Sequence, residues 1–178
     1  VRCYAGVLGT GLSAVALWTA NGTQNSAQFG FGVAGAGDVN GDGRSDVVVG
    51  EPYYDEATAD HGRIHVFHSN GSTLALNGTR DGPLSNVQLG YAVSAAGDMN
   101  GDGYGDLLVG VPGYTSGRGR IMVFRGGPSG IEAISSAVAF TGPTGSDRLG
   151  TTVALAGDVD GDGLSDLVTS FNHSRGAQ

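Results

Sequence analysis

Short apolar runs recur along the 178-residue chain, and each is too brief to span a membrane. The runs at residues 47–49 and 107–109 are continuously apolar, as in strands that are buried on both faces. The runs at 63–67 and 120–124 follow the period of two expected of a strand with one packed face. No segment has the spacing of an amphipathic helix. The pattern therefore predicts an all-β protein built from short strands.

The predicted strands repeat as a unit of about sixty residues. A strand of small residues at 32–35 or 91–94 comes first, the continuous apolar run second and the alternating run third. A fourth strand follows a turn, at 74–76 or 137–140. Four short strands per unit, joined by tight turns, predict a β-propeller of four-stranded antiparallel blades. Glycine and alanine in the first strand suit the crowded inner edge of a blade.

The phase of the repeat predicts how the blades are divided along the chain. Residues 29–88 and 89–148 each hold a complete blade, whereas 149–178 holds only the inner strands of a third. Residues 1–28 supply outer strands, the last of them at 12–18, so one blade is split between the two termini. Residues 1–178 are thus a single propeller domain or part of one, with about three blades' worth of chain. Two copies could exchange their N-terminal strands and close a six-bladed ring, or the chain could be a fragment of a longer propeller.

A nine-residue acidic loop lies between the first and second strands of each unit, at a constant spacing of sixty residues. Side-chain oxygens stand at positions 1, 3, 5 and 9, glycine at position 6, and position 7 would offer its backbone carbonyl. Such oxygen ligands suit Ca²⁺, which accepts six to eight of them at flexible distances. The three loops predict three Ca²⁺ sites, with the candidate ligands Asp38, Asn40, Asp42, Arg44, Asp46, Asp98, Asn100, Asp102, Tyr104, Asp106, Asp158, Asp160, Asp162, Leu164 and Asp166.

These loops are not EF-hands, and an acidic turn without an ion is the alternative. An EF-hand places glutamate at position 12, where this chain has Val49, Val109 and Thr169. Ion-free Asx turns are common singly, but three clusters of like charges in register would repel themselves. Ten of the 14 aspartates lie in the loops, and three Ca²⁺ ions, contributing +6, would bring the formal charge from −8 to −2.

Composition narrows the class of protein further. The net charge of −8 argues against a nucleic-acid partner. Cys3 is the only cysteine, so no disulfide can form within the chain. Calcium is then the remaining candidate for a cross-link that stabilises the fold. All nine basic residues are arginine, which fits the coding bias of a GC-rich bacterial gene.

The loops are accompanied by two further motifs, Phe29-Gly30 before the loop and Gly50-Glu51-Pro52 or Gly110-Val111-Pro112 after it. Together they resemble the FG-GAP repeats of the integrin α-subunit β-propeller and its bacterial relatives, over nearly the whole chain. The resemblance implies blades around a central axis, with calcium bound between the first two strands of a blade. The third repeat departs from the pattern, with Ser170-Phe171-Asn172 in place of Gly-x-Pro. Integrin propellers also have seven blades, and this chain has material for about three.

These observations predict a calcium-binding module for recognition or adhesion, in which calcium rigidifies the loops. Loops of this kind are suited to extracellular calcium at roughly 10⁻⁴–10⁻³ M, which predicts a secreted or cell-surface protein. Expected partners are calcium, a protein or glycan ligand, and a second copy or the rest of a longer propeller. The most ligand-like loop is 51–56, which has adjacent aromatic and acidic residues.

Two alternatives remain open at the level of sequence. One is an accessory or catalytic propeller of a secreted hydrolase or lyase, and the other is an architectural subunit that assembles by strand exchange. We expect no enzyme, because no nucleophile elbow, phosphate loop or Cys/His pairing stands out. His61, His65 and His68 cluster in sequence, but alternation along a strand turns His65 and His68 to opposite faces. A mechanism based on paired carboxylates stays open.

Overall fold

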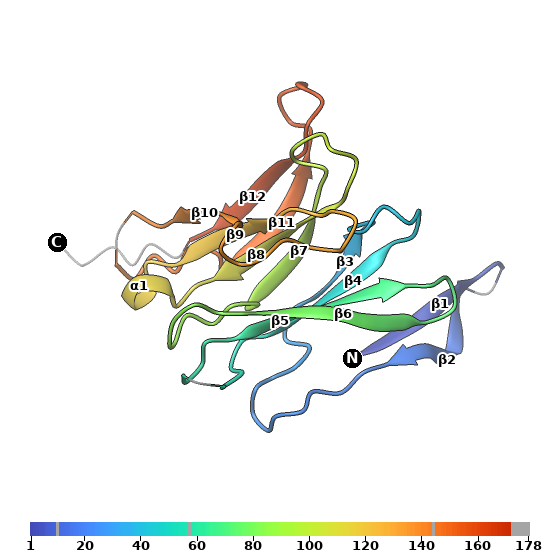
Figure 1. Ribbon diagram of the computed structural model, residues 1–178, viewed down its shortest axis with the longest axis horizontal. Coiled ribbons are helices and arrows are strands. Elements are labelled where there is room, and N and C mark those ends of the chain that lie inside the picture. Colours follow the sequence, from blue (N-terminus) through green and yellow to red (C-terminus); the bar gives the residue numbers. More distant parts are fainter. Residues whose placement is uncertain (10, 57, 144, 172–178) are drawn as a thin grey trace.

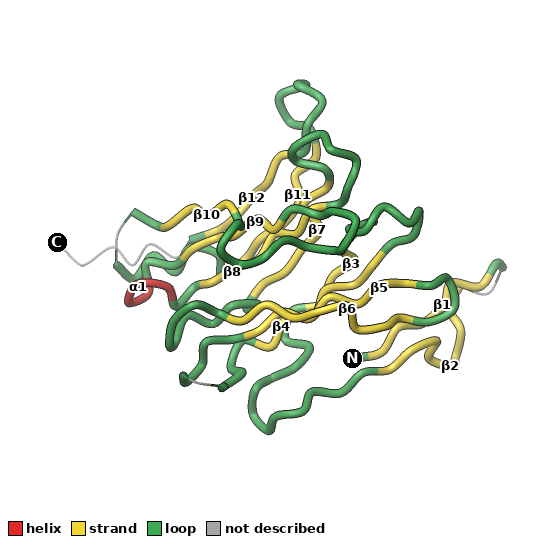
Figure 2. Tube along the Cα trace, viewed as in Figure 1, coloured by secondary structure: helices red, strands yellow, loops and turns green. Residues whose placement is uncertain are grey.

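The computed structural model describes residues 1–171 except 10, 57 and 144, and over that range the protein is almost entirely β (Figures 1 and 2). Twelve strands form two four-stranded and two two-stranded sheets, all antiparallel. The one helical element within this range, α1 (Tyr114–Gly117), contains two residues with left-handed dihedral angles and is better described as a turn. No helix in the described part of the chain is both long and apolar enough to cross a membrane. The all-β prediction is confirmed.

Each four-stranded sheet is a meander in which neighbours in sequence are neighbours in space, as predicted for a blade. The first sheet has the order β3 (Val33–Gly37), β4 (Asp46–Glu51), β5 (Arg63–Ser69), β6 (Leu74–Asp81). The second contains β7 (Ala92–Gly97), β8 (Asp106–Val111), β9 (Arg120–Phe124) and β10 (Val138–Thr141). Within these sheets a tight turn, residues 70–73, joins β5 to β6, and longer loops join the other neighbouring strands.

The two remaining sheets lie at opposite ends of the array (Figure 1). β1 (Arg2–Val7) and β2 (Gly11–Thr19) pack beside the first blade, where the Trp18 ring meets Phe67 edge-on at 4.7 Å between centroids. β11 (Thr152–Gly157) and β12 (Asp166–Ser170) adjoin the second blade through β7 and β8. The described sheets therefore form an open arc, not a closed ring. The last residues of the predicted split blade (149–178), namely 172–178, lie outside the described residues.

The first strands of successive repeats form the inner edge of this arc. β3 lies against β7, and β7 lies against β11. Behind them, one apolar cluster joins Val48 and Ile64 of the first blade to Val109 and Phe124 of the second. All four side chains are fully buried, and each such burial stabilises the fold by ~1.5–3 kcal/mol. The blades therefore pack face to face through a shared core.

The seam between successive repeats is formed by main chain at two glycine pairs. A Cβ atom on Gly50 would lie 1.9 Å from the carbonyl oxygen of Gly90, and one on Gly110 would lie 1.9 Å from that of Gly150. Gly90 and Gly150 themselves have φ values of 84° and 87°, which L-residues with a side chain rarely adopt. The glycine after Leu89 or Leu149 is thus required because it meets the glycine of the preceding repeat's Gly-x-Pro motif.

The hairpin β1–β2 and the hairpin β5–β6 both contain register shifts. The pairing of β5 with β6 shifts register after Val66, and the pairing of β1 with β2 shifts register after Cys3 and again after Tyr4. Superposing the first shift of each hairpin aligns Cys3 with Val66 and Tyr4 with Phe67.

Glu51 and His65 form a buried hydrogen-bonded pair where the first blade meets the segment before β3. Glu51 is fully buried, and its Oε2 lies 2.8 Å from Nε2 of His65. The Phe29 ring packs edge-on against the imidazole at 5.0 Å. Burial lowers the pKa of His65 below its ordinary value, even though the adjacent Glu51 carboxylate acts in the opposite direction. The folded protein therefore favours the neutral imidazole.

This pKa shift makes the stability depend on pH. Below about pH 6.5 the unfolded chain binds a proton at His65 that the folded chain resists, so stability should fall as the pH drops through this window. The slope from one group is at most about 1.4 kcal/mol per pH unit. Urea denaturation between pH 5 and 8 checks this by comparison with His65→Gln, which should have a shallower profile. Parallel profiles for the two proteins would contradict it.

Candidate metal centres

The three acidic loops connect the first and second strands of successive sheets, namely β3–β4, β7–β8 and β11–β12. They lie on one side of the molecule, away from α1 (Figure 1). Neighbouring loops are in contact, because the N–H of Gly105 donates to the carbonyl of Asp38 at 2.7 Å. The fifteen predicted ligands therefore fall in three groups of five, one in each loop. Among the described residues, only the third loop brings one oxygen from each of three carboxylates within 4.8 Å of one another.

The aspartate at position 1 is held by backbone N–H groups of its own loop. The N–H at position 6 donates to its Oδ2 at 2.7 Å in the first loop, 2.8 Å in the second and 3.0 Å in the third. Position 5 donates to its Oδ1 in each loop. In the second loop these bonds, that from Gly103 above all, lower the pKa of Asp98. The Asp98 carboxylate is therefore oriented by its own loop and favoured in its ionised form.

The middle positions are arranged in the same way in each loop. Oδ1 of the position 5 aspartate accepts the N–H of position 7, at 3.0, 3.0 and 2.8 Å along the chain. Oδ1 of position 3 accepts the N–H of position 5 at 3.1 Å in all three. Arg44, Tyr104 and Leu164 at position 7 take part through their backbone, which explains why their side chains differ.

The aspartate at position 9 begins the second strand and is the most buried of the acidic groups. Asp46 is 1% exposed and Asp106 fully buried. Each accepts one N–H from position 2 of its loop and one from the end of the third strand, Ser69 or Gly126, at 3.0 Å. Burial raises the pKa of both carboxyl groups. A nearby cation would offset this cost of holding the charge away from water.

The third loop differs at this position. Asp166 accepts the N–H of Val159 at 2.8 Å, but no third strand follows β12 among the described residues to donate the second bond. Asp166 is accordingly half-buried. One carboxylate oxygen each from Asp158, Asp160 and Asp166 lie within 4.8 Å of one another. These are hard oxygen donors around one point, which fits a calcium ion.

Sequence reasoning missed the residues that surround these loops. Nδ1 of His68, on β5, lies 3.2 Å from the amide nitrogen of Asn40 in the first loop. Ser69 and Gly126 act only through backbone N–H groups, for which no side-chain pattern exists. The predicted opposition of His65 and His68 is consistent with these contacts, since His65 turns instead to Glu51 and stacks near Phe67.

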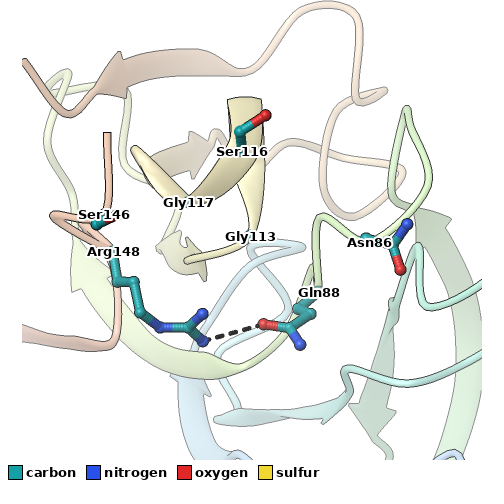
Figure 3. A pocket seen from close by; sticks show the side chains of 7 residues that line it. All are labelled: Asn86, Gln88, Gly113, Ser116, Gly117, Ser146 and Arg148. Carbon is teal, nitrogen blue, oxygen red and sulfur yellow. Dashed lines mark hydrogen bonds between the residues drawn. The ribbon is translucent and has the colours of Figure 1, made fainter. Parts of the chain in front are cut away.

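A shallow pocket of about 370 Å³ lies at the opposite strand ends (Figure 3). Its lining comes from three connections of two successive repeats, and Nη2 of Arg148 donates to Oε1 of Gln88 across it at 3.2 Å. The pocket therefore carries one cation, Arg148, which is held by this bond. The lining residues are Asn86, Gln88, Gly113, Ser116, Gly117, Ser146 and Arg148.

Comparison with known proteins agrees with the motifs. Residues 29–67 and 89–124 match the FG-GAP repeat family. Human integrin alpha-IIb is 39% identical over 130 residues, which cover 66% of this chain and 12% of the integrin. Integrin alpha-PS2 of Drosophila melanogaster is 38% identical over 125 residues, covering 64% and 9% respectively. The chain thus spans about a tenth of the length of these relatives.

Proposed function

Because this chain carries FG-GAP repeats, as integrin α-subunits do, we propose that it is a calcium-binding β-propeller module of an extracellular recognition or adhesion protein. The observation that carries the proposal is the repeated acidic loop, in which the first and last aspartates are oriented by backbone N–H groups. The integrin relatives are adhesion receptors, which favours recognition over the hydrolase or lyase alternative. The cell surface or the extracellular space is the matching location.

Calcium is proposed to stiffen the loops and, through them, the face they form. The Asp38 carbonyl is tied to Gly105, so an ion in one loop restrains the next. A Cβ on Gly41 would lie 2.7 Å from the ring of Tyr104, so the second loop also packs closely on the first. Ions in adjacent loops would therefore order one continuous surface.

Titration calorimetry tests the sites directly. The protein is expected to bind three Ca²⁺ ions, and Asp102→Asn should lower the stoichiometry to two because position 5 of one loop loses its charge. Asp60→Asn, which removes a carboxylate on the opposite side of the blade, is the matched control and should keep three. A stoichiometry that Asp102→Asn leaves unchanged would show that the second loop does not hold an ion.

An adhesion assay tests the recognition role. Cells are allowed to settle on surfaces coated with this chain, in millimolar calcium or in excess chelator, with albumin-coated surfaces as the control. Retention above the albumin level only in calcium is expected. Equal retention on both coatings in calcium would remove the support for an adhesion role of this segment.

A specific observation also favours assembly through the open sheet edges. Val168 on β12 is 54% exposed. Val48 and Leu108, at the same position in their repeats, are fully buried and pair with the third strand of their sheets. The register shift that β1–β2 shares with β5–β6 supports the assignment of β1 as a strand of that missing type. Extending the register of the complete blades would place Cys3 opposite Val168, and the N–H of Gly6 near Asp166. We therefore propose that β1 of a second copy completes the β12 sheet.

Oxidative cross-linking tests this pairing. In Val168→Cys, the new thiol should form a disulfide with Cys3 of another copy, giving a covalent dimer on a non-reducing gel. Adding Cys3→Ser should abolish that band. A single-chain mass by light scattering, with no cross-linked species, would instead indicate that the edges are completed by further repeats of a longer propeller.

A further inference from the structure

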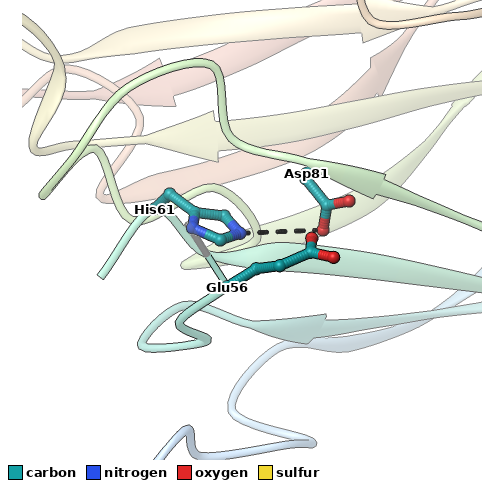
Figure 4. A group of neighbouring side chains, drawn as sticks. All are labelled: Glu56, His61 and Asp81. Atoms are coloured by element: carbon teal, nitrogen blue, oxygen red, sulfur yellow. Dashed lines mark ion pairs between the residues drawn. The ribbon is translucent and has the colours of Figure 1, made fainter. Parts of the chain in front are cut away.

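Three side chains converge at the strand ends opposite the acidic loops (Figure 4). Glu56 and His61 come from the connection between β4 and β5, and Asp81 ends β6. One ligand atom of each lies within 4.8 Å of the others. His61 is 3% exposed, whereas the Glu56 side chain is 62% exposed. The group therefore combines one buried residue, His61, with one exposed residue, Glu56.

The hydrogen bonding of His61 determines which ring nitrogen faces the carboxylates. Nδ1 lies 3.0 Å from the carbonyl oxygen of Thr58, which can only accept, so Nδ1 carries the proton of the neutral ring. Nε2 then presents its lone pair to the group. This atom is buried and has no hydrogen-bond partner among the described residues, and Oδ1 of Asp81 stands 3.8 Å away. A buried lone pair that faces a carboxylate is unfavourable unless a cation lies between them.

We propose that Glu56, His61 and Asp81 bind a divalent transition-metal ion of the Zn²⁺ class, separate from the calcium sites. An imidazole nitrogen is a ligand that Zn²⁺ accepts readily and that the oxygen-seeking Ca²⁺ does not. The bond from Nδ1 to a backbone carbonyl is the arrangement that orients metal-binding histidines. Three protein ligands and a water would complete a tetrahedral shell.

The ligand atoms must draw together for this ion to bind. Bonds of about 2.0–2.2 Å in a tetrahedral shell place ligand atoms roughly 3.4 Å apart, which is closer than the 3.8 Å between His61 and Asp81. The side chains of Asp81 and Glu56 are 37% and 62% exposed, and both can move toward the buried His61. The required contraction is therefore within the reach of side-chain adjustment.

Arg63 competes with the ion for the two carboxylates. Its Nη2 lies 3.1 Å from Glu56, its Nε donates to Asp81, and its guanidinium lies 3.9 Å from the centre of the Tyr54 ring. An ion would displace the guanidinium from the carboxylates, while its existing stacking on Tyr54 could be retained. The proposal thus predicts opposite effects for two substitutions: removing His61 weakens binding, and removing Arg63 strengthens it.

Calorimetric titration of Zn²⁺ into the calcium-saturated full chain tests the site, since the acidic loops are then filled. One Zn²⁺ site is expected in the unaltered protein. His61→Gln should weaken it by tenfold or more, in the range of losses seen when metal-site residues are changed. Arg63→Gln should tighten it. Asp60→Asn, a loss of charge at the neighbouring position, should leave the affinity within about twofold and controls for general electrostatics.

Glu56→Gln provides a second route to the same answer, because the exposed Glu56 side chain can be changed without disturbing the core. Circular dichroism establishes which variants fold. Weakened Zn²⁺ binding in folded Glu56→Gln supports the site even where His61→Gln fails to fold. Absence of a Zn²⁺ site in the calcium-saturated protein, or equal affinity in Glu56→Gln and the unaltered chain, would overturn the proposal while leaving the calcium sites unaffected.

Discussion

Removal of calcium with excess chelator is expected to lower the melting temperature of the protein by about 4–20 °C. The range follows from ligand linkage. At about 2 mM calcium and dissociation constants of ~10⁻⁴–10⁻³ M, each site stabilises the fold by roughly 0.7–1.8 kcal/mol. Three sites then contribute about 2–5 kcal/mol, and for a chain of this length each kcal/mol shifts the melting temperature by roughly 2–4 °C.

The electrostatics of the loops give the physical reason. Asp46 and Asp106 are buried beside other carboxylates of the same loop, and burial already raises their pKa. Differential scanning calorimetry in millimolar calcium and in chelator measures the difference, and added calcium should restore the higher value. Asp102→Asn should reduce the calcium-dependent shift by about a third, since one of three equal sites is lost. Identical melting in both buffers would rule out stabilisation by calcium.

Gly50→Ala is expected to destabilise the protein by about 3 kcal/mol, at the upper end of the range for overpacking. The added Cβ would meet main chain, because the carbonyl oxygen of Gly90 lies 1.9 Å from where it would stand. A carbonyl held in a neighbouring repeat cannot rotate aside as a side chain would, so the two repeats must separate or distort.

The control is a glycine in the adjacent strand. A Cβ on Gly35 would have no atom within 4 Å, so Gly35→Ala should change the stability by less than about 1 kcal/mol in either direction. Urea denaturation midpoints of the two variants and the unaltered protein, all in calcium, provide the comparison. Similar midpoints for Gly50→Ala and Gly35→Ala would mean that the backbone around Gly90 can move to accommodate the added Cβ at a small cost in stability.

The parts of the molecule that could be predicted are those recorded in local patterns. The strands at 63–67 and 120–124 follow from alternation, and both are found within β5 and β9. The acidic loops could be found because all their candidate ligands lie within nine residues and recur three times. The spacing of sixty residues then made the four-stranded blade predictable from any one repeat.

The parts that could not be predicted depend on pairing between distant segments. His61 and Asp81 approach each other because β5 and β6 pair with Arg63 opposite Asp81, and a single sequence does not specify that register. Asp106 and Asp166 occupy the same position of their loops but differ in burial, because among the described residues a third strand lies beside only the first of them. The contact of Gly50 with Gly90 joins residues forty positions apart, and its only mark in the sequence is the two glycines themselves.

The main-chain seam between repeats has a consequence for how such chains grow. Gly62 bridges Leu89 and Gly119 bridges Leu149 through the same parallel backbone pairing. This main-chain part of the junction does not depend on side chains, so it can form between any two repeats that keep these glycines. Unequal recombination between repeats could therefore insert or delete whole blades in frame, and each product would inherit a working junction. Blade number can then change in a lineage without new contacts having to be selected at every seam.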